Sequence, residues 1–234
     1  KKAIGAGAGN PPVIVDDTVD VVKAAIDIVN GASFDNNLPC IAEKECFAFN
    51  TIADKLIDAM TKNGAYLISG AQVDKLLSFA LINKNGKYVI NKDWVGRDAS
   101  KFLKELGIDA DPRLIICEVE ENHPFVQTEM MMPVLPIVRV NDIDEAIEMA
   151  VKAEHGCRHS AHIHSKNVDR LTRFARAVET TIFVKNAPSY AGIGAGGEGY
   201  TTFTIAGPTG EGLTAAHSFT RSRRCVMVDG LHIV

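Results

Sequence analysis

Short apolar runs alternate with amphipathic stretches along most of this chain, and that alternation limits the folds it can adopt. Val13–Val15 and Leu114–Val119 are apolar runs of strand length, whereas residues 19–31 and 168–178 place apolar side chains at helical spacing. Strands that alternate with helices usually pair in parallel, and an apolar run suits a strand that is covered on both faces. The sequence therefore predicts an α/β fold with a largely parallel sheet.

The composition fits a globular protein with a substantial core and excludes some partners. The chain has 234 residues, of which 46% are hydrophobic. Its 25 basic and 29 acidic residues nearly balance, and Arg221–Arg224 is the only basic cluster, so we expect no nucleic-acid partner. No apolar stretch approaches the roughly 20 residues that span a bilayer. We therefore expect no membrane segment and a cytoplasmic protein.

The cysteines indicate a reducing compartment. Their number is odd and none of them forms a CxxC pair, which argues against a disulfide framework and against a zinc knuckle. The five cysteines are Cys40, Cys46, Cys117, Cys157 and Cys225.

Cys40 is the candidate nucleophile because of where it stands in the chain. It lies between a helical pattern that stops at Asn30–Gly31 and an apolar run over Cys46–Phe49, and Pro39 prevents the helix from continuing through it. A thiol on such a helix-to-strand turn has backbone N–H groups beside it, which favour a thiolate and a developing oxyanion. The alternative is that Cys40 is a small buried apolar side chain.

Histidines cluster over Arg158–Ser165, where strand alternation sorts them onto two faces. His159 shares a face with Ala161 and Ile163, whereas His162 and His164 point to the other face. Two histidines without a nearby third ligand do not make a metal site, so we expect no metal. A neutral His159 imidazole could move a proton, and the alternative is a hydrogen-bonded core histidine.

Two glycine-rich segments resemble phosphate loops without the helix that such loops need. Gly5–Gly9 runs into Asn10 and two prolines, and the GxGxxG spacing at Gly194, Gly196 and Gly199 precedes a predicted strand over residues 200–205. We therefore expect tight turns rather than dinucleotide loops. Residues 218–228 alternate their side chains and predict an edge strand that could pair with another subunit.

A motif around Cys40 connects the chain to a known family. Phe34–Glu45, with the sequence FDNNLPCIAEKE, closely resembles the catalytic-cysteine segment of CoA-acylating aldehyde dehydrogenases. The branch that it resembles most is the propionaldehyde and acetaldehyde dehydrogenases of bacterial microcompartments. The resemblance continues through Lys185–Tyr190 to Arg224–Cys225, and so covers essentially the whole chain.

The resemblance implies a site and a reaction. Cys40 matches the family nucleophile, Glu129 matches a glutamate that contacts the cofactor ribose, and His159 matches a histidine near the nucleophile. The implied reaction oxidises a short-chain aldehyde, propionaldehyde or acetaldehyde, with NAD and coenzyme A to acyl-CoA and NADH through a Cys40 thioester. Judged alone, Glu129 fits a solvated loop residue as well.

The segment before Cys40 favours transfer to CoA over hydrolysis. Hydrolytic family members carry a water-activating glutamate there, whereas this chain has no carboxylate before Asp16. The alternatives are a hydrolytic NAD(P)-dependent aldehyde dehydrogenase and a catalytically silent structural or interaction module. The resemblance also implies a homo-oligomer and association with a microcompartment shell, with the protein in the cytoplasm or inside the compartment.

The family architecture implies three regions and a longer parent protein. Residues 1–33 are expected to end an NAD-binding domain, residues 34–207 to form the catalytic domain, and residues 208–234 to form a return segment and an oligomerisation strand. The chain starts at Lys1 without a methionine and runs directly into apolar residues. We therefore expect an incomplete chain that lacks most of the cofactor domain and shows little activity alone.

Overall fold

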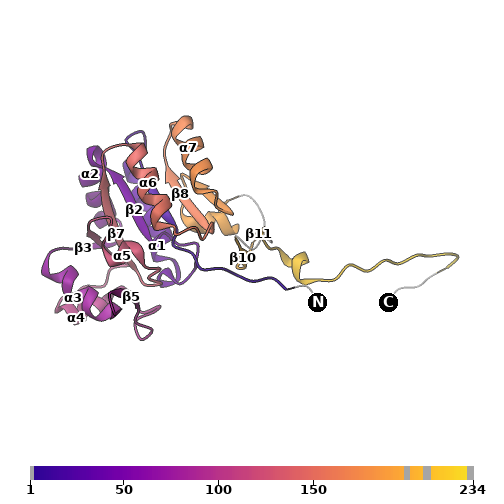
Figure 1. The fold of residues 1–234 in the computed structure, drawn as a ribbon, viewed down its shortest axis with the longest axis horizontal. Helices are drawn as coiled ribbons and strands as arrows, with labels where there is room; N and C mark the ends of the chain where they lie inside the picture. Colours follow the sequence, from indigo (N-terminus) through magenta and orange to yellow (C-terminus); the bar gives the residue numbers. More distant parts are fainter. Residues whose placement is uncertain (1–2, 198–200, 208–211, 231–234) are drawn as a thin grey trace.

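The structure is a computed structural model that describes residues 3–197, 201–207 and 212–230. Its centre is a parallel sheet (Figure 1). The seven strands of this sheet lie in the order β3-β6-β7-β2-β1-β8-β9. This sheet confirms the predicted α/β fold. The strands are β1 (Pro12–Val15), β2 (Glu45–Phe49), β3 (Ala65–Ile68), β6 (Leu114–Glu118), β7 (Val134–Val140), β8 (Ser160–His164) and β9 (Ile182–Lys185).

Two pairs of helices cover the sheet. From β1 the chain moves one way through α1 (Val21–Ser33) and α2 (Asn50–Lys62), and from β7 it moves the other way through α6 (Ile143–Ala153) and α7 (Val168–Val178). Right-handed crossovers in opposite directions place the two pairs on opposite faces, where α1 contacts α2 and α6 contacts α7 (Figure 1). The covered strands β1 and β2 are therefore buried along their whole length.

A smaller unit flanks the β3 and β6 side of the sheet. It contains α3 (Ala71–Ala80), the hairpin β4 (Leu81–Lys84) and β5 (Lys87–Ile90), α4 (Ala99–Leu106) and α5 (Pro124–Gln127). Phe79, Trp94 and Phe102 pack their rings against one another there. None of the helices in the described ranges combines the length and hydrophobicity that a membrane crossing requires.

The amino-terminal part of the chain is built into the same sheet as the rest. Residues 12–33 form β1 and α1, and β1 lies between β2 and β8 in the middle of the sheet. The domain boundary expected at residue 34 therefore does not coincide with a break in the sheet. The division into three functional regions stays a prediction.

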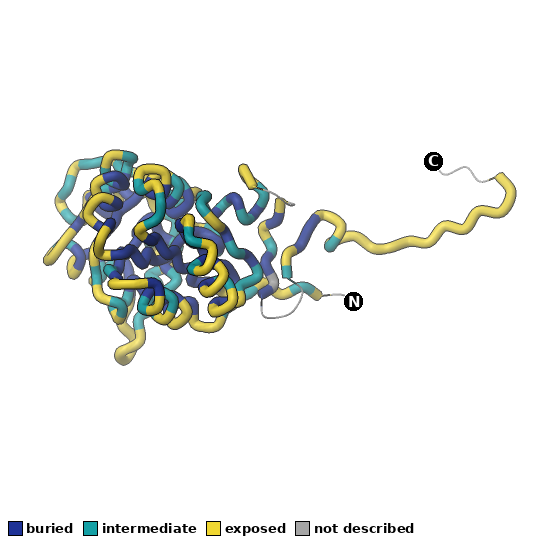
Figure 2. The backbone as a smooth tube through the Cα atoms, turned by 90° about the horizontal axis from the view of Figure 1, so that it is seen from above, coloured by how far each residue is buried: buried dark blue, intermediate teal, exposed yellow. Residues whose placement is uncertain are grey.

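The strand predicted over residues 200–205 is wrong for the part that the structure describes, and the strand predicted over residues 218–228 has no partner within this chain. Of residues 200–205, residue 200 lies outside the described ranges, and the only strand nearby is β10 (Ile205–Ala206), paired with β11 (Gly212–Leu213). After the short helix η3 (Ala216–Phe219), residues 220–230 form no strand and run away from the body, exposed throughout (Figure 2). An extended segment without a neighbouring strand has no ladder to join. Pairing with another subunit stays a prediction.

Candidate active site

The turn that carries Cys40 depends on three residues in an unusual conformation. Asp35, Asn36 and Asn37 have φ angles of 46°, 52° and 63°, all in the left-handed region. Asp and Asn tolerate this region better than other non-glycine residues because their short polar side chains bond locally. The Asp-Asn-Asn part of the motif is therefore explained by the reversal of the chain at the end of α1.

Asn37 and Lys44 fix this turn from inside. The Asn37 side-chain amide donates to the carbonyl oxygens of Ala32 at 2.8 Å and Glu43 at 2.9 Å. The buried Lys44 ammonium donates to the Asn37 carbonyl at 2.8 Å, the Asn37 Oδ1 at 2.5 Å and the Pro39 carbonyl at 3.1 Å. The backbone on both sides of Cys40 is thereby held in place.

Glu43 ties the Cys40 loop to the second conspicuous motif. Its carboxylate accepts a hydrogen bond from the backbone N–H of Ser189 at 3.0 Å, within the Lys185–Tyr190 segment. The carboxylate lies against Gly31, where an added Cβ would come within 2.4 Å of it. Burial raises the pKa of Glu43 to about 7. A carboxylate with these contacts serves to hold two segments together.

The predicted site residues meet because parallel strands begin at the same edge of a sheet. Cys40 precedes β2, Glu129 precedes β7 and His159 precedes β8, and Gly9 precedes β1. These four strands are neighbours in the order β7-β2-β1-β8. The candidate site therefore lies at the amino edge of the sheet.

Gly9 lies directly between Cys40 and His159. A Cβ added at Gly9 would lie 2.9 Å from Cγ of His159 and 3.2 Å from the carbonyl oxygen of Cys40. Only a residue without a side chain fits at that distance. Sequence reasoning missed this role, because the spacing of the glycines in Gly5–Gly9 suggested only a turn.

Glu129 and Lys44 carry opposite charges and shift the pKa of Cys40 in opposite directions. Burial raises the pKa of the half-buried Cys40 thiol and the Glu129 carboxylate raises it further, whereas the Lys44 ammonium lowers it. Burial likewise raises the pKa of Glu129, whereas the Lys44 ammonium and the Gly9 backbone N–H lower it. Lys44 is a second residue that sequence reasoning missed, although its place in the Glu-Lys-Glu end of the motif was a signal.

His159 is a neutral histidine with one free ring nitrogen. Its Nδ1 is hydrogen bonded to Ser160 Oγ at 2.7 Å, and its backbone N–H donates to Glu154 at 3.1 Å. Nε2 has no hydrogen-bond partner among the described residues. Burial, and then Lys44, lower the pKa of His159 to about 4. At neutral pH the ring is therefore uncharged, and Nε2 is free to accept a proton in the tautomer whose Nδ1 donates to Ser160.

An apolar cavity of about 320 Å³ opens onto Cys40. Glu129, Lys44 and His159, which form a polar cluster beside Cys40, are not among the residues that line this cavity. Cys40 therefore adjoins both the cavity and the Glu129–Lys44–His159 cluster. The lining residues are Asp35, Leu38, Pro39, Cys40, Ile41, Ile193, Phe203 and Ile205. A short alkyl chain suits such a wall.

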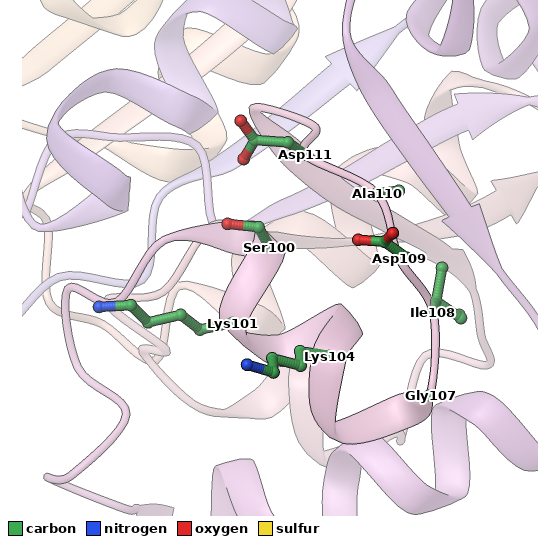
Figure 3. A pocket seen from close by; sticks show the side chains of 8 residues that line it. All are labelled: Ser100, Lys101, Lys104, Gly107, Ile108, Asp109, Ala110 and Asp111. Atoms are coloured by element: carbon green, nitrogen blue, oxygen red, sulfur yellow. The ribbon is translucent and has the colours of Figure 1, made fainter.

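Other candidate regions offer less chemistry. A cavity of about 830 Å³ lies beside α4, where Lys101 and Lys104 lie on the helix and Asp109 and Asp111 on the following loop (Figure 3). These charges are spread around the rim and include no cysteine or histidine. The described residues contain no group of side chains that could hold a metal ion.

Comparisons with known proteins agree with one another. The model of the aldehyde dehydrogenase family matches residues 1–220. The chain is 53% identical to a propanal dehydrogenase (CoA-propanoylating) of Salmonella typhimurium, covering 100% of this chain and 50% of that protein. It is 48% identical to an acetaldehyde dehydrogenase (acetylating) of Escherichia coli, covering 100% of this chain and 51% of the relative. The chain thus spans about half the length of these curated relatives.

Solved structures of similar proteins share the fold. The Rhodopseudomonas palustris propionaldehyde dehydrogenase, solved with bound CoA and an acylated cysteine, is 56% identical with a TM-score of 0.90, over 97% of this chain and 52% of that one. A propionaldehyde dehydrogenase from the Clostridium phytofermentans fucose utilisation microcompartment is 56% identical with a TM-score of 0.89, over 99% and 53% of the two chains.

Proposed function

This chain belongs to the aldehyde dehydrogenase family, and on that premise we propose that it carries the nucleophile of a CoA-acylating aldehyde dehydrogenase. The substrate is a short-chain aldehyde, which NAD and CoA convert to acyl-CoA and NADH. The observation that carries the proposal is the position of the Cys40 thiol, which adjoins both the apolar cavity and the Glu129–Lys44–His159 cluster.

The first step belongs to Cys40. Its thiolate attacks the aldehyde carbon and forms a thiohemiacetal, while the apolar cavity holds the alkyl chain. The Cys40 backbone N–H, which favours the thiolate, would donate to the oxygen that becomes negative. His159 accepts or returns a proton at Nε2, since its ring stays neutral at the pH of the reaction.

Glu129 is the residue that would hold the nicotinamide cofactor. Its half-buried carboxylate, which the Gly9 N–H helps to keep charged, fits the hydroxyl groups of a ribose as a hydrogen-bond acceptor. Bound NAD would take up the hydride that converts the thiohemiacetal to a thioester. Glu129 thereby orients the cofactor beside Cys40 and takes no other part.

The thioester is released by the thiol of CoA, which enters as a co-substrate. Support comes from the segment before β1, in which the described residues from 3 to 11 include no carboxylate that could activate water. The first carboxylate, Asp16, lies at the other end of β1, where Ser165 donates to it at 2.5 Å. A thioester without a positioned base waits for a better nucleophile than water.

One observation, the raised pKa of Glu129, favours an alternative function, that of a hydrolytic aldehyde dehydrogenase. Glu129 is a carboxylate with a raised pKa in the same cluster as Cys40, and such a group can serve as a base for water. If it does so, the product is a free acid whose formation does not require CoA.

We further propose a homo-oligomer and a location in the cytoplasm, within a microcompartment and associated with its shell. Support for the location is the similarity to a propionaldehyde dehydrogenase from a bacterial microcompartment. Support for the oligomer is the exposed segment at residues 220–230, which includes the apolar side chains of Val226, Met227 and Val228.

Product analysis with and without CoA tests the proposed reaction. We expect propionaldehyde, NAD and CoA to give propionyl-CoA and NADH, with no propionate when CoA is omitted, and we expect Cys40→Ser to abolish both products. Turnover by these 234 residues should be slow, since the curated relatives are about twice as long. Propionate formed equally with and without CoA would instead establish the hydrolytic enzyme.

A further inference from the structure

Lys44 is a buried cation at the Cys40 turn. Its side chain is 1% exposed, and its ammonium donates to three oxygens, two on Asn37 and one on Pro39. All three are neutral, and none of the ion pairs among the described residues includes Lys44. Burying an ammonium without a paired carboxylate costs several kcal/mol. A neutral donor could hold the same oxygens at a lower cost, so the charge itself needs an explanation.

The positive charge of Lys44 acts on the sulfur of Cys40. Among the groups that shift the pKa of Cys40, Lys44 is the only one whose charge favours the thiolate, and it opposes both burial and Glu129. The influence is mutual, because Cys40 in turn raises the pKa of Lys44. Burial, and then Lys44, lower the pKa of His159, so that ring stays neutral. The ammonium thus acts on the nucleophile and the proton acceptor together.

We propose that Lys44 is a positioning residue that acts through Cys40: its hydrogen bonds fix the turn before the thiol, and its buried charge stabilises the thiolate. The inference deepens the proposed function, and it rests on Cys40 being the nucleophile. It explains why the motif places a buried lysine four residues after the cysteine.

The charge is present only over part of the pH range. Burial lowers the pKa of Lys44 to about 8, so the ammonium is retained at neutral pH and lost above pH 8. The charged and titratable groups that act on it or respond to it are Glu129, Cys40, Glu45, Glu43 and His159. The stabilisation of the thiolate is therefore greatest below pH 8.

Alkylation of Cys40 by iodoacetamide, followed by peptide mapping over pH 6 to 10, tests the electrostatic part. Lys44→Gln keeps an N–H donor without the charge, so the alkylation rate of Cys40 at pH 7 should fall about tenfold, and the difference from wild type should shrink above pH 8, where Lys44 itself loses its charge. Lys44→Arg keeps the charge and should restore the wild-type rate at pH 7. Glu129→Gln removes the opposing charge and should raise that rate. Lys62→Gln, on the exposed face of α2, is the matched control.

A purely structural lysine would behave differently. It would leave the pH 7 alkylation rate unchanged in Lys44→Gln, and that result overturns the proposal. For any Lys44 variant that fails to fold, the wild-type chain supplies the test: the logarithm of the Cys40 alkylation rate should rise less steeply with pH above pH 8, where the ammonium is lost, than below it. The same slope on both sides of pH 8 would contradict the coupling. Neither measurement requires turnover, so a failed product analysis and a failed Lys44 test are distinguishable.

Discussion

At the scale of single residues, the site depends on two positions where the backbone packs so closely that only glycine fits. Gly9 separates Cys40 from His159, and Gly31 makes room for the Glu43 carboxylate. Both glycines are necessary because of backbone packing against distant residues. A local sequence pattern does not contain that information, which is why sequence analysis identified Cys40 and His159 without the glycine between them.

Replacement of Gly9 by alanine should damage the site while its neighbour Gly7 tolerates the same change. The new Cβ would lie 2.9 Å from the His159 ring at position 9, but 3.7 Å from the Gly207 carbonyl at position 7, which is an ordinary contact. We expect Gly9→Ala to lose about 1–3 kcal/mol in free energy of unfolding and to slow Cys40 alkylation. Denaturant titration of both variants measures this, and equal losses would contradict the packing argument.

At the scale of elements, the strand β8 shows what an alternating pattern does and does not predict. Alternation correctly assigned residues 160–164 to a strand, but the sheet is covered on both faces, so His162 and His164 are as buried as Ala161 and Ile163. Both ring nitrogens of His162 lack a hydrogen-bond partner among the described residues. Burial, the larger cause, and His164 lower the pKa of His162 to about 3.

His162 should therefore make the protein sensitive to acid. The unfolded state takes up a proton near pH 6.5 and the folded state only near 3, so stability is lost as the pH falls below 6.5. At pH 4.5 the loss amounts to about 3 kcal/mol. We expect His162→Leu to be at least as stable as wild type at pH 7 and clearly more stable at pH 4.5. Thermal unfolding of both proteins at both pH values measures this. An equal loss of stability between pH 7 and pH 4.5 in the two proteins would contradict the prediction.

At the scale of the whole molecule, the order of the strands explains the site. Segments that are far apart in the sequence meet because β7, β2, β1 and β8 are neighbours and begin at one edge. The alternation of apolar runs and amphipathic stretches was enough to predict a parallel sheet. The strand order depends on which crossovers pack together, and this is a tertiary property that local patterns do not specify.

The carboxyl-terminal segment shows that an alternating pattern alone does not make a strand. Residues 218–228 have the alternation of a strand, yet within this chain they form none, because a strand requires a partner. If the partner is a second copy, ending the chain at Phe219 should lower the number of subunits per particle in light scattering, since residues 220–230 are exposed within the single chain. The same number of subunits with and without this segment would refute its role in assembly.

The transfer of an acyl group from Cys40 to CoA is tested most directly by following that group without NAD. The chain is treated with labelled propionyl-CoA, the acylated peptide is identified by mass spectrometry, and unlabelled CoA is then added in oxygen-18 water. Our account predicts a labelled propionyl thioester on Cys40 alone and its recovery as propionyl-CoA. Acylation of other cysteines, or recovery of the label as propionate containing oxygen-18, would contradict it.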